Sequence, residues 1–270
     1  MKLIHCGDVV GKAGRQAVLE YIPDLRRRLD LDFVIINGEN AARGFGITAK
    51  ICKSFYDAGV DVITTGNHVW AQRDIVNHID GDPRLLRPLN YPPATPGRGA
   101  NTYKATGGRK VKVIHPMGRL FMEPLDDPFA AVEAELVNHR LGTTMDCVVI
   151  DIHAEATSEK MAIGHAFDGR VSMVVGTHTH VPTADARILP GGTAYQTDLG
   201  MCGDYDSVIG MKKEAAVARF VKKATDERLS PAEGAATLCG VYLETDDASG
   251  LATHISPIRL GGLLAKQWPL

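Results

Sequence analysis

The sequence predicts one α/β domain over residues 1–270 with a mixed sheet system, and three observations predict it. Short β-branched runs alternate with helical stretches over the first two-thirds of the chain, as in folds that layer helices on sheets. Residues 237–244 and 253–258 then have the pattern of a closing antiparallel pair. Finally, 44% of the 270 residues are hydrophobic, enough for one buried core, and no internal repeat, low-complexity tract or linker divides the chain.

The expected strands are short apolar runs rich in valine and isoleucine. They cover residues 3–5, 33–36, 60–64, 111–114, 148–150, 171–175 and 193–197. The proline-rich stretch of residues 83–96 is expected to be irregular, because proline is excluded from helix interiors and central strands.

Helices are expected where apolar residues recur at helical spacing. Thr48 is the expected N-cap of the second one, because threonine side chains cap helix N-termini. A further helix is expected before the strand at residues 171–175. The other expected helices cover residues 14–29, 49–58, 130–140 and 212–225.

Charge and cysteine usage limit the class of protein. The formal net charge is −2, which argues against a dedicated nucleic-acid binder, so RNA as a partner has no support from charge. Five scattered cysteines without a CxxC pair indicate a reducing compartment. The N-terminus lacks a signal-peptide pattern, and no apolar stretch approaches the roughly 20 residues of a membrane span. We therefore expect a cytoplasmic protein without a membrane partner; the oligomeric state stays open, a homo-oligomer included.

Five expected strands run directly into short polar clusters. Because the carboxyl ends of strands in open α/β sheets converge on one edge, where ligands bind, these clusters are expected to meet in one cleft. The clusters are Gly7-Asp8, Asn37-Gly38-Glu39-Asn40, Gly66-Asn67-His68, Asp151-Ile152-His153 and Gly176-Thr177-His178-Thr179-His180.

Each cluster alone has an ordinary structural explanation. An Asp or Asn after a strand is usually a turn residue or a helix cap, and a single His such as His153 is more often hydrogen-bonded structure. The pair His178 and His180 is harder to explain in that way, because residues two apart in an extended segment face the same side. Together the clusters therefore favour a metal site.

The number and type of these side chains suggest how many metal ions they bind. Two carboxylates, amide oxygens and three imidazoles exceed the needs of one tetrahedral zinc ion and suit two ions that share a ligand. Mixed oxygen and nitrogen ligands without thiolate fit manganese, iron or zinc.

The ordered motifs resemble the signature of the calcineurin-like metallophosphoesterases, which is D-x-H, G-D-x-x-D, G-N-H, a lone His and G-H-x-H. Two departures are informative: Val10 stands where that signature has a His, and Gly38-Glu39-Asn40 stands where it has a bridging Asp. The matching residues are Asp8, Gly66-Asn67-His68, His153 and Gly176-Thr177-His178-Thr179-His180.

With those departures, the sequence resembles the YmdB-like subfamily. The similarity extends over essentially the whole chain, including residues 5–11, 37–42 and 198–201. The resemblance implies a two-sheet α/β sandwich and a di-iron or di-manganese centre, with zinc as an alternative. It also implies phosphodiesterase activity towards cyclic nucleotides, including 2′,3′-cyclic ones.

The resemblance also implies two ligand sets that share Glu39. The longer Glu39 side chain, with Asn40 added, compensates for the ligand lost at Val10. One metal ion would take Asp8, Glu39, Asn40 and His180. The other would take Glu39, Asn67, His153 and His178. A water between the two cations would supply hydroxide near neutral pH for in-line attack on phosphorus.

His68 is not needed as a ligand and lies next to Asn67, so it is the predicted catalytic residue. It would protonate the leaving alkoxide or bind the phosphate. The alternative is a buried turn histidine.

Other polar residues near the motifs have two explanations each. Arg43 and residues 44–46 would either contact the substrate phosphate or form a flexible lead to the helix after Thr48. Thr177 and Thr179 are expected to hydrogen-bond around the ligands. Glu155 would orient His153 or face solvent. His5 and Cys6 are expected to be structural.

Two other functions remain open at this point. One is another two-metal hydrolase of the amidohydrolase type, in which an H-x-H pair normally follows the first strand; here the pair follows a late one. The other is a non-enzymatic or weakly active regulator that binds metal and nucleotide.

Overall fold

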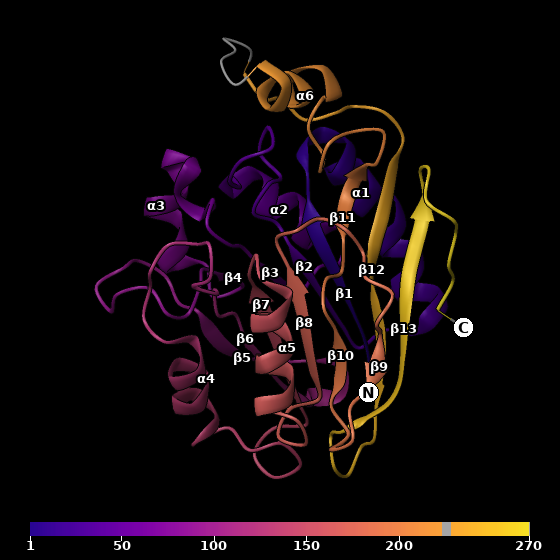
Figure 1. Cartoon of the computed structure of the whole chain (residues 1–270). Coiled ribbons are helices and arrows are strands. Elements are labelled where there is room, and N and C mark those ends of the chain that lie inside the picture. The colour runs from indigo at the N-terminus through magenta and orange to yellow at the C-terminus, as the bar shows by residue number, and fades with distance from the viewer. Residues whose placement is uncertain (223–227, 270) are drawn as a thin grey trace.

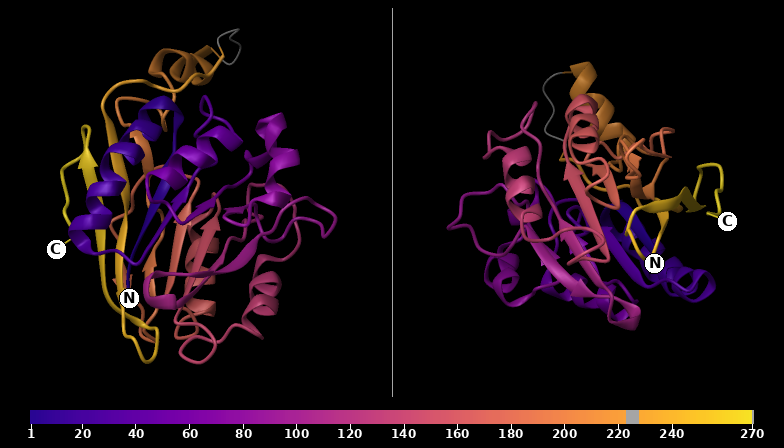
Figure 2. Two further views of the ribbon diagram at one scale, coloured as in Figure 1. Left: turned by 180° about the vertical axis from the view of Figure 1, so that it is seen from behind. Right: turned by 90° about the horizontal axis from the view of Figure 1, so that it is seen from below.

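Two β-sheets pack face to face at the centre of the structure, and helices cover both outer faces (Figures 1 and 2). The computed structural model describes residues 1–222 and 228–269. The predicted fold class, a two-sheet α/β sandwich, is confirmed.

The first sheet has seven strands in the order β13-β12-β11-β1-β2-β3-β4. β11 and β2 both pair with β1 in parallel, and β3 and β4 extend this parallel part. β12 pairs antiparallel with β1, and β13 pairs antiparallel with β12, as expected for the closing pair. The bounds are β1 Lys2–Val9, β2 Phe33–Asn37, β3 Val62–Thr64, β4 Leu85–Leu86, β11 Met201–Asp204, β12 Ala236–Thr245 and β13 Ala252–Gly261.

The second sheet has six strands in the order β5-β6-β7-β8-β10-β9. Its four inner strands are parallel, and β5 and β9 are antiparallel strands at its edges. The bounds are β5 Ala100–Lys104, β6 Lys110–Ile114, β7 Cys147–His153, β8 Met173–Thr177, β9 Arg187–Ile188 and β10 Ala194–Gln196.

The helices place their apolar residues on the outer faces of the sheets. Val18 of α1 and Phe55 of α2 belong to the core between the helices and the first sheet. Val132 of α4 and Ile163 of α5 belong to the core on the second sheet. The bounds are α1 Gly11–Leu29, α2 Ala49–Asp57, α3 Arg73–His78, α4 Pro128–Leu136, α5 Thr157–Ala166 and α6 Lys213–Lys222, with short 3-10 turns at Val69–Ala71, Ile79–Gly81 and Thr106–Gly108.

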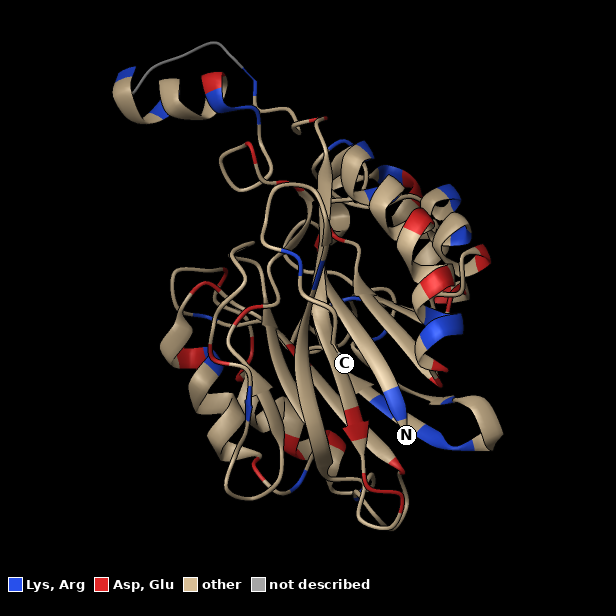
Figure 3. Cartoon of the chain, turned by 90° about the vertical axis from the view of Figure 1, so that its right-hand side faces the viewer, with Lys and Arg blue, Asp and Glu red and all other residues tan. Residues whose placement is uncertain are grey.

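A third apolar core lies between the two sheets. Leu3 and Phe33 of the first sheet meet Val113 and Val149 of the second there. Ile4, the neighbour of Leu3, lies in the core under the helices, because successive side chains of a strand face opposite sides. In the view of Figure 3, basic and acidic residues are interspersed along the helices, and most of each strand is uncharged.

The element boundaries differ from the predictions in places with clear physical causes. Leu85 and Leu86 form a short strand on β3 inside the stretch that was expected to be irregular, because its prolines flank them. The helix expected at residues 130–140 is α4, which begins earlier because Asp127 caps it and Pro128 occupies its first turn. It ends at Leu136. β5 was not predicted, since its sequence ANTYK is mostly polar and suits an edge strand.

Two further helix predictions concern the cap of α2 and the helix at residues 212–225. Thr48 is the N-cap of α2, and its Oγ1 accepts a hydrogen bond from the Ile51 N–H at 3.4 Å, as predicted. Part of the helix predicted at residues 212–225 is α6, and residues 223–225 lie outside the described residues. Among the described helices, none combines the length and the apolar composition that crossing a membrane requires.

Candidate metal centre

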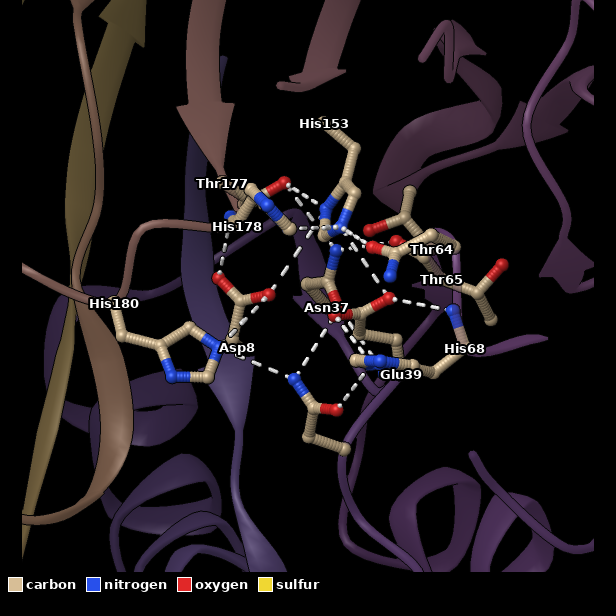
Figure 4. A network of polar contacts seen from close by, with 12 residues as sticks. Asp8, Asn37, Glu39, Thr64, Thr65, His68, His153, Thr177, His178 and His180 are labelled. Carbon is tan, nitrogen blue, oxygen red and sulfur yellow. Dashed lines mark hydrogen bonds and ion pairs between the residues drawn. The ribbon is translucent and has the colours of Figure 1, made fainter. Parts of the chain in front are cut away.

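The predicted ligands gather where the carboxyl ends of strands from both sheets meet (Figure 4). The first sheet contributes a residue of β1 and residues from the turns after β2 and β3. The second sheet contributes the last residue of β7 and the loop after β8. The structure brings together the whole predicted set: Asp8, Glu39, Asn40, Asn67, His153, His178 and His180.

One group of potential ligand atoms surrounds the His153 ring. Its Nε2 lies 3.1 Å from Asn67 Oδ1, 3.3 Å from Glu39 Oε2 and 3.1 Å from His178 Nδ1. Ligand atoms converge in this way when they face a common point. The group has the composition of the second predicted ligand set.

A second group lies beside it and shares Glu39. Asp8 Oδ1 is 3.7 Å from His180 Nε2, and the Asn40 amide lies 2.9 Å from Glu39 Oε1 and 3.1 Å from His180 Nε2. Rotation of the Asn40 amide by 180° exchanges its oxygen and nitrogen and turns an oxygen toward this group. Glu39 thus points one carboxylate oxygen at each group, so its side chain is shared between them.

The surroundings of Asp8 fit a bound cation. Both Asp8 and Glu39 are buried, and Asp8 Oδ1 has no hydrogen-bond partner among the described residues. A buried carboxylate oxygen without a partner is costly unless a cation neutralises it. Burial raises the pKa of Asp8 to about 6, with the Glu39 charge adding to the shift and His180 and His153 opposing it.

The other ionisable side chains are set by their mutual contacts. Burial opposes ionisation of Glu39, yet His153 and His68 hold the pKa of its carboxyl well below its usual range. Burial lowers the pKa of His153, but Glu39 more than compensates and the result is about 8. Burial and the neighbouring His153 lower the pKa of His178 to about 3, so its imidazole is neutral and able to bind a metal.

In each of the three candidate ligand histidines, the ring nitrogen that faces away from the other ligands contacts an oxygen atom. Metal-binding histidines typically have such a partner, because it fixes the tautomer and the ring orientation. The contacts are His153 Nδ1 to Thr177 Oγ1 at 2.9 Å, His178 Nε2 to Glu155 Oε2 at 3.2 Å and His180 Nδ1 to the Ile209 carbonyl at 2.8 Å. Thr177 therefore acts as expected. Glu155, for which contact with His153 and exposure to solvent were the two expectations, is half exposed and contacts His178 instead of His153.

Gly66 lets two ligands approach the turn after β3. A Cβ atom at this position would lie 2.2 Å from Glu39 Oε2 and 2.3 Å from His153 Nε2. Such distances are far below contact distance, so only glycine fits. The glycine of the Gly66-Asn67-His68 motif thus has a steric function at the centre.

A buried polar layer lies beneath the ligands and includes the expected structural residue His5. Asp151 Oδ1 accepts a hydrogen bond from Thr177 Oγ1 at 2.8 Å, and Asp151 Oδ2 lies 3.4 Å from His5 Nε2 and 3.5 Å from His115 Nδ1. Burial opposes ionisation of Asp151, but the two histidines and Thr64 lower the pKa of this carboxyl. Asp151 therefore supports the His153 ring through Thr177.

The loop of His178 and His180 brings its two rings together by turning, not by strand alternation. β8 ends at Thr177, and both histidines have positive φ angles, 98° and 65°. The predicted extended geometry is therefore wrong, although both rings reach the site. Asp198 holds the loop between them, since its Oδ2 accepts hydrogen bonds from Thr179 N–H at 3.2 Å and Thr179 Oγ1 at 2.7 Å.

His68 lies at the edge of the ligand groups and lines the cavity. Its side chain is 34% exposed, and its Nδ1 is 3.0 Å from Asn40 Oδ1 and 3.4 Å from Glu39 Oε1. Its backbone N–H donates to Glu39 Oε2 at 3.2 Å. This position allows His68 to reach a ligand in the cavity, and its contact with Asn40 also suits the structural alternative, which stays open.

The segment after Asn40 is a tight, hydrogen-bonded loop. Ala42 N–H donates to the Gly46 carbonyl at 2.8 Å, and Gln72 Nε2 donates to the Phe45 carbonyl at 2.7 Å. These bonds contradict a flexible lead into α2. Arg43 is exposed and does not line the cavity beside the ligands, whereas Phe45 does.

A cavity of about 280 Å³ opens onto the ligand groups. Three larger hollows, of 400, 440 and 340 Å³, lie on α4, near Arg119 and beside α1, and they contain none of the predicted site residues, so we assign the site to the smaller cavity. Its described lining is Glu39, Asn40, Phe45, His68, Glu155, His178, Thr179, His180, Ile209, Met211 and Leu229.

A two-sheet α/β sandwich with carboxylate, amide and imidazole side chains at its strand ends is the arrangement expected of a metallophosphoesterase. The chain matches the YmdB-like protein family over residues 4–258. It is 49% identical over 260 residues to a Bacillus subtilis (strain 168) protein named 2′,3′-cyclic-nucleotide 2′-phosphodiesterase, with 96% of this chain and 97% of that one covered. The chain belongs to the YmdB-like family.

Solved structures agree with this membership. A hypothetical protein from Thermus thermophilus has a TM-score of 0.90 at 42% identity, covering 97% of this chain and 100% of that one. A novel phosphatase from Mycoplasma pneumoniae has a TM-score of 0.90 at 35% identity, covering 97% and 93%. The predictions of the family and of a phosphoric diester hydrolase are confirmed, and the amidohydrolase alternative is wrong.

Proposed function

We propose that this protein is a binuclear metal-dependent phosphodiesterase that acts on cyclic nucleotides, 2′,3′-cyclic ones in particular. The observation that carries the proposal is Glu39, whose two carboxylate oxygens face two separate groups of ligand atoms. The name of the Bacillus subtilis relative supports the substrate class. The Mycoplasma genitalium relative, 34% identical, is named a putative phosphatase/phosphodiesterase, which supports the reaction class.

The two proposed ligand sets would share Glu39. When bound, two such ions supply positive charge that stabilises the transition state and an activated water for attack on phosphorus. Iron and manganese suit the mixed oxygen and nitrogen donors, with zinc as the alternative. The first ion would take Asp8, Glu39, Asn40 and His180. The second would take Glu39, Asn67, His153 and His178.

His68 is the proposed general acid. Its Nδ1 lies 3.0 Å from the end of the Asn40 side-chain amide, which fixes the ring at the border between ligands and cavity. With the Asn40 oxygen turned toward the ligand group, the amide N–H donates to Nδ1, and the ring carries its proton on Nε2. The other ring nitrogen, Nε2, would give its proton to the leaving ribose oxygen as the P–O bond breaks. A poor alkoxide leaving group needs that proton, and a positioned acid typically contributes about 10²–10⁴-fold in rate.

Diesters are the preferred substrates on electrostatic grounds. The described lining of the cavity includes Glu39 and Glu155 but neither Lys nor Arg. A phosphodiester carries one negative charge, whereas a phosphomonoester dianion carries two and gains more from cationic side chains. The cavity therefore suits the singly charged substrate.

The chain as a whole is proposed to act as one cytoplasmic domain. The site takes residues from both sheets, and β12, late in the chain, pairs with β1, so residues 1–270 form one unit in this proposal. All five cysteines are free and buried, as suits a reducing compartment. The oligomeric state stays open.

Purified protein loaded with manganese or iron tests the proposal. We expect hydrolysis of adenosine 2′,3′-cyclic phosphate that is lost on chelation and restored by the metal. Glu39→Ala should be inactive with either metal, and Glu20→Ala, an exposed glutamate of α1, is the matched control. A metal-loaded protein that hydrolyses no phosphodiester would refute the proposal in favour of the regulator alternative.

A further inference from the structure

The cavity beside the ligands has an apolar side that phosphoryl chemistry does not need. Phe45, Ile209, Met211 and Leu229 line it together with the polar site residues. Its volume of about 280 Å³ lies near the lower end of small-molecule sites, which run from about 300 Å³. It is therefore larger than a phosphate group requires.

The backbone around Phe45 is fixed so that this aromatic ring stays at the cavity. Arg43, Gly44 and Gly46 all have positive φ angles, 57°, 88° and 78°. The loop is closed by the Ala42-to-Gly46 hydrogen bond, and the Phe45 carbonyl is held by Gln72. The Phe45 ring meets the His68 ring edge-on, with 5.1 Å between centroids.

Ile209 occupies a turn position that its residue type disfavours. Val208 and Met211 exchange two backbone hydrogen bonds, 2.9 and 3.0 Å long, around a two-residue turn of Ile209 and Gly210. Both turn residues have positive φ, 47° and 94°, as in a type I′ turn, where Asn, Asp or Gly is usual. A β-branched residue at positive φ is strained, and such strain tends to occur at functional sites.

Burial explains the choice of isoleucine only in part, because Ile209 lines the cavity and is 54% exposed. Its carbonyl orients His180, but any residue supplies a carbonyl. A role of the exposed Ile209 side chain would therefore explain why isoleucine stands at this turn.

We propose that Phe45 and Ile209 form the two walls of a subsite for the nucleobase of the substrate; this inference rests on the proposed function. The phosphate would lie at the ligand groups, and the base would extend along the apolar side of the same cavity. An aromatic ring binds a nucleobase by stacking, which contributes enough for roughly 5- to 100-fold in affinity.

The subsite would hold a base without reading its identity. Its apolar residues have no hydrogen-bonding side chains with which to distinguish the edges of the four bases. Stacking is tolerant of base identity because every base has an aromatic face. We therefore expect kcat/KM for the four 2′,3′-cyclic nucleotides to lie within roughly tenfold of one another, a range that stacking alone allows.

Two substrates with the same reacting ring test the role of Phe45. Adenosine 2′,3′-cyclic phosphate and glycerol 1,2-cyclic phosphate share a five-membered cyclic diester, but the second has no base. With manganese-loaded protein, Phe45→Ala should raise KM for the adenosine substrate roughly 5- to 100-fold. The change for the glycerol substrate should be much smaller, and Phe45→Trp should restore the adenosine KM. Equal changes on both substrates would overturn the subsite.

Ile209→Asn tests the second wall with two readouts of opposite sign. Asn tolerates positive φ, so the melting temperature should rise, while the kcat/KM ratio of adenosine to glycerol substrate should fall. Ile188→Asn, at a 40% exposed isoleucine of β9, is the matched control and should leave that ratio unchanged. A more stable Ile209→Asn protein with the wild-type ratio would remove Ile209 from the subsite.

A binding measurement separates this inference from the proposed function. 2-Aminopurine riboside loses fluorescence when it stacks, so the manganese-loaded wild-type protein should quench it and Phe45→Ala should quench it less. If the wild-type protein hydrolyses neither diester, the proposed function fails, and quenching still decides the subsite. Absent quenching, or quenching that Phe45→Ala leaves unchanged, contradicts the subsite.

Discussion

Lys160 Nζ lies 2.7 Å from Asp198 Oδ2, and both side chains are completely buried. The same Asp198 oxygen accepts the two hydrogen bonds from Thr179, between the ligand candidates His178 and His180. An ion pair in the interior therefore fixes a loop whose two histidines have positive φ angles.

Lys160→Met is expected to destabilise the protein strongly. Removing one partner of a buried ion pair leaves an uncompensated charge, which typically costs about 3–5 kcal/mol. Urea unfolding of the metal-free protein measures this loss. Lys53→Met, at the exposed pair with Asp57, is the control and should change stability little. Equal stability of the two variants would mean that Asp198 holds the loop without its lysine.

Gly66→Ala is expected to abolish metal binding at both positions. The added Cβ would lie 2.2 Å from Glu39 Oε2 and 2.3 Å from His153 Nε2, and one of these ligands must move. Elemental analysis of the purified variant measures the bound metal. Gly81→Ala is the matched control, because a Cβ there meets nothing within 4 Å. Full metal content in Gly66→Ala would show that the ligands are not where we place them.

Glu39→Ala and Asp8→Ala should differ in how many ions they lose. Glu39 faces both ligand groups, so its removal should empty both, whereas Asp8 belongs to one group and its removal should mainly weaken one ion. Metal-to-protein ratios after gel filtration give the answer. Two retained ions in Glu39→Ala, or one ion in the wild-type protein, would contradict a shared ligand.

Stability should depend on pH with opposite sign in the metal-free and metal-bound protein. Burial raises the pKa of Asp8 to about 6, and Glu39 outweighs burial to raise that of His153 to about 8. Both groups hold protons that the unfolded chain releases, whereas His178, whose pKa is lowered to about 3, lacks a proton that the unfolded chain holds up to an ordinary pKa of about 6.5. Below that pH the contributions oppose each other, so the stability of the metal-free protein should fall mainly between about pH 6.5 and 8, where His153 loses its proton. Metal binding requires both groups deprotonated, so the stabilisation by manganese should grow over the same range.

Melting temperatures measured across this pH range, in chelator and in excess manganese, check the prediction. Asp8→Asn removes a group whose contribution to stability is lost as pH rises from about 4 to 6, so below about pH 6 the metal-free stability should rise more with pH than in the wild-type protein. Parallel curves with and without manganese would mean that neither group competes with the metal for protons.

His68→Ala should retain both metals and the fold but lose about 10²–10⁴-fold in activity, as expected for a missing general acid. The loss should be largest for ribose leaving groups and smaller for p-nitrophenyl esters, whose leaving group hardly needs a proton. His165→Ala, at an exposed histidine of α5, is the control. An equal loss of activity on both substrate types would contradict the general-acid role. A lowered melting temperature of the variant would indicate a structural role for His68.

The ligand candidates could be predicted because each one follows a strand that is recognisable locally. Asp8, Asn67 and His153 stand at the ends of apolar runs, and parallel strands bring such ends to one edge. The fold follows from the same runs together with the helical periodicity. The edge strand β5 was missed because its polar sequence depends on pairing with β6.

Most supports of the site could not be predicted, because they join residues that are distant in the sequence. The Ile209 carbonyl that orients His180 is a backbone group, and its role cannot be inferred from the residue type. The same holds for Lys160 and Asp198, which are 38 residues apart, and for His115 beneath Asp151. Signals existed for Asp151, which directly follows a buried run and precedes His153 by two positions, and for Thr177 and Thr179, which alternate with the ligand histidines.

The ligand candidates come from both sheets, with Asp8 on β1 and His153 on β7. Ions bound there would consequently be cross-links across the seam between the two halves of the sandwich. Binding to the folded chain alone adds to its stability in proportion to the logarithm of the free metal concentration. Cellular metal supply would then determine how long each molecule survives proteolysis, in addition to how fast it turns over substrate.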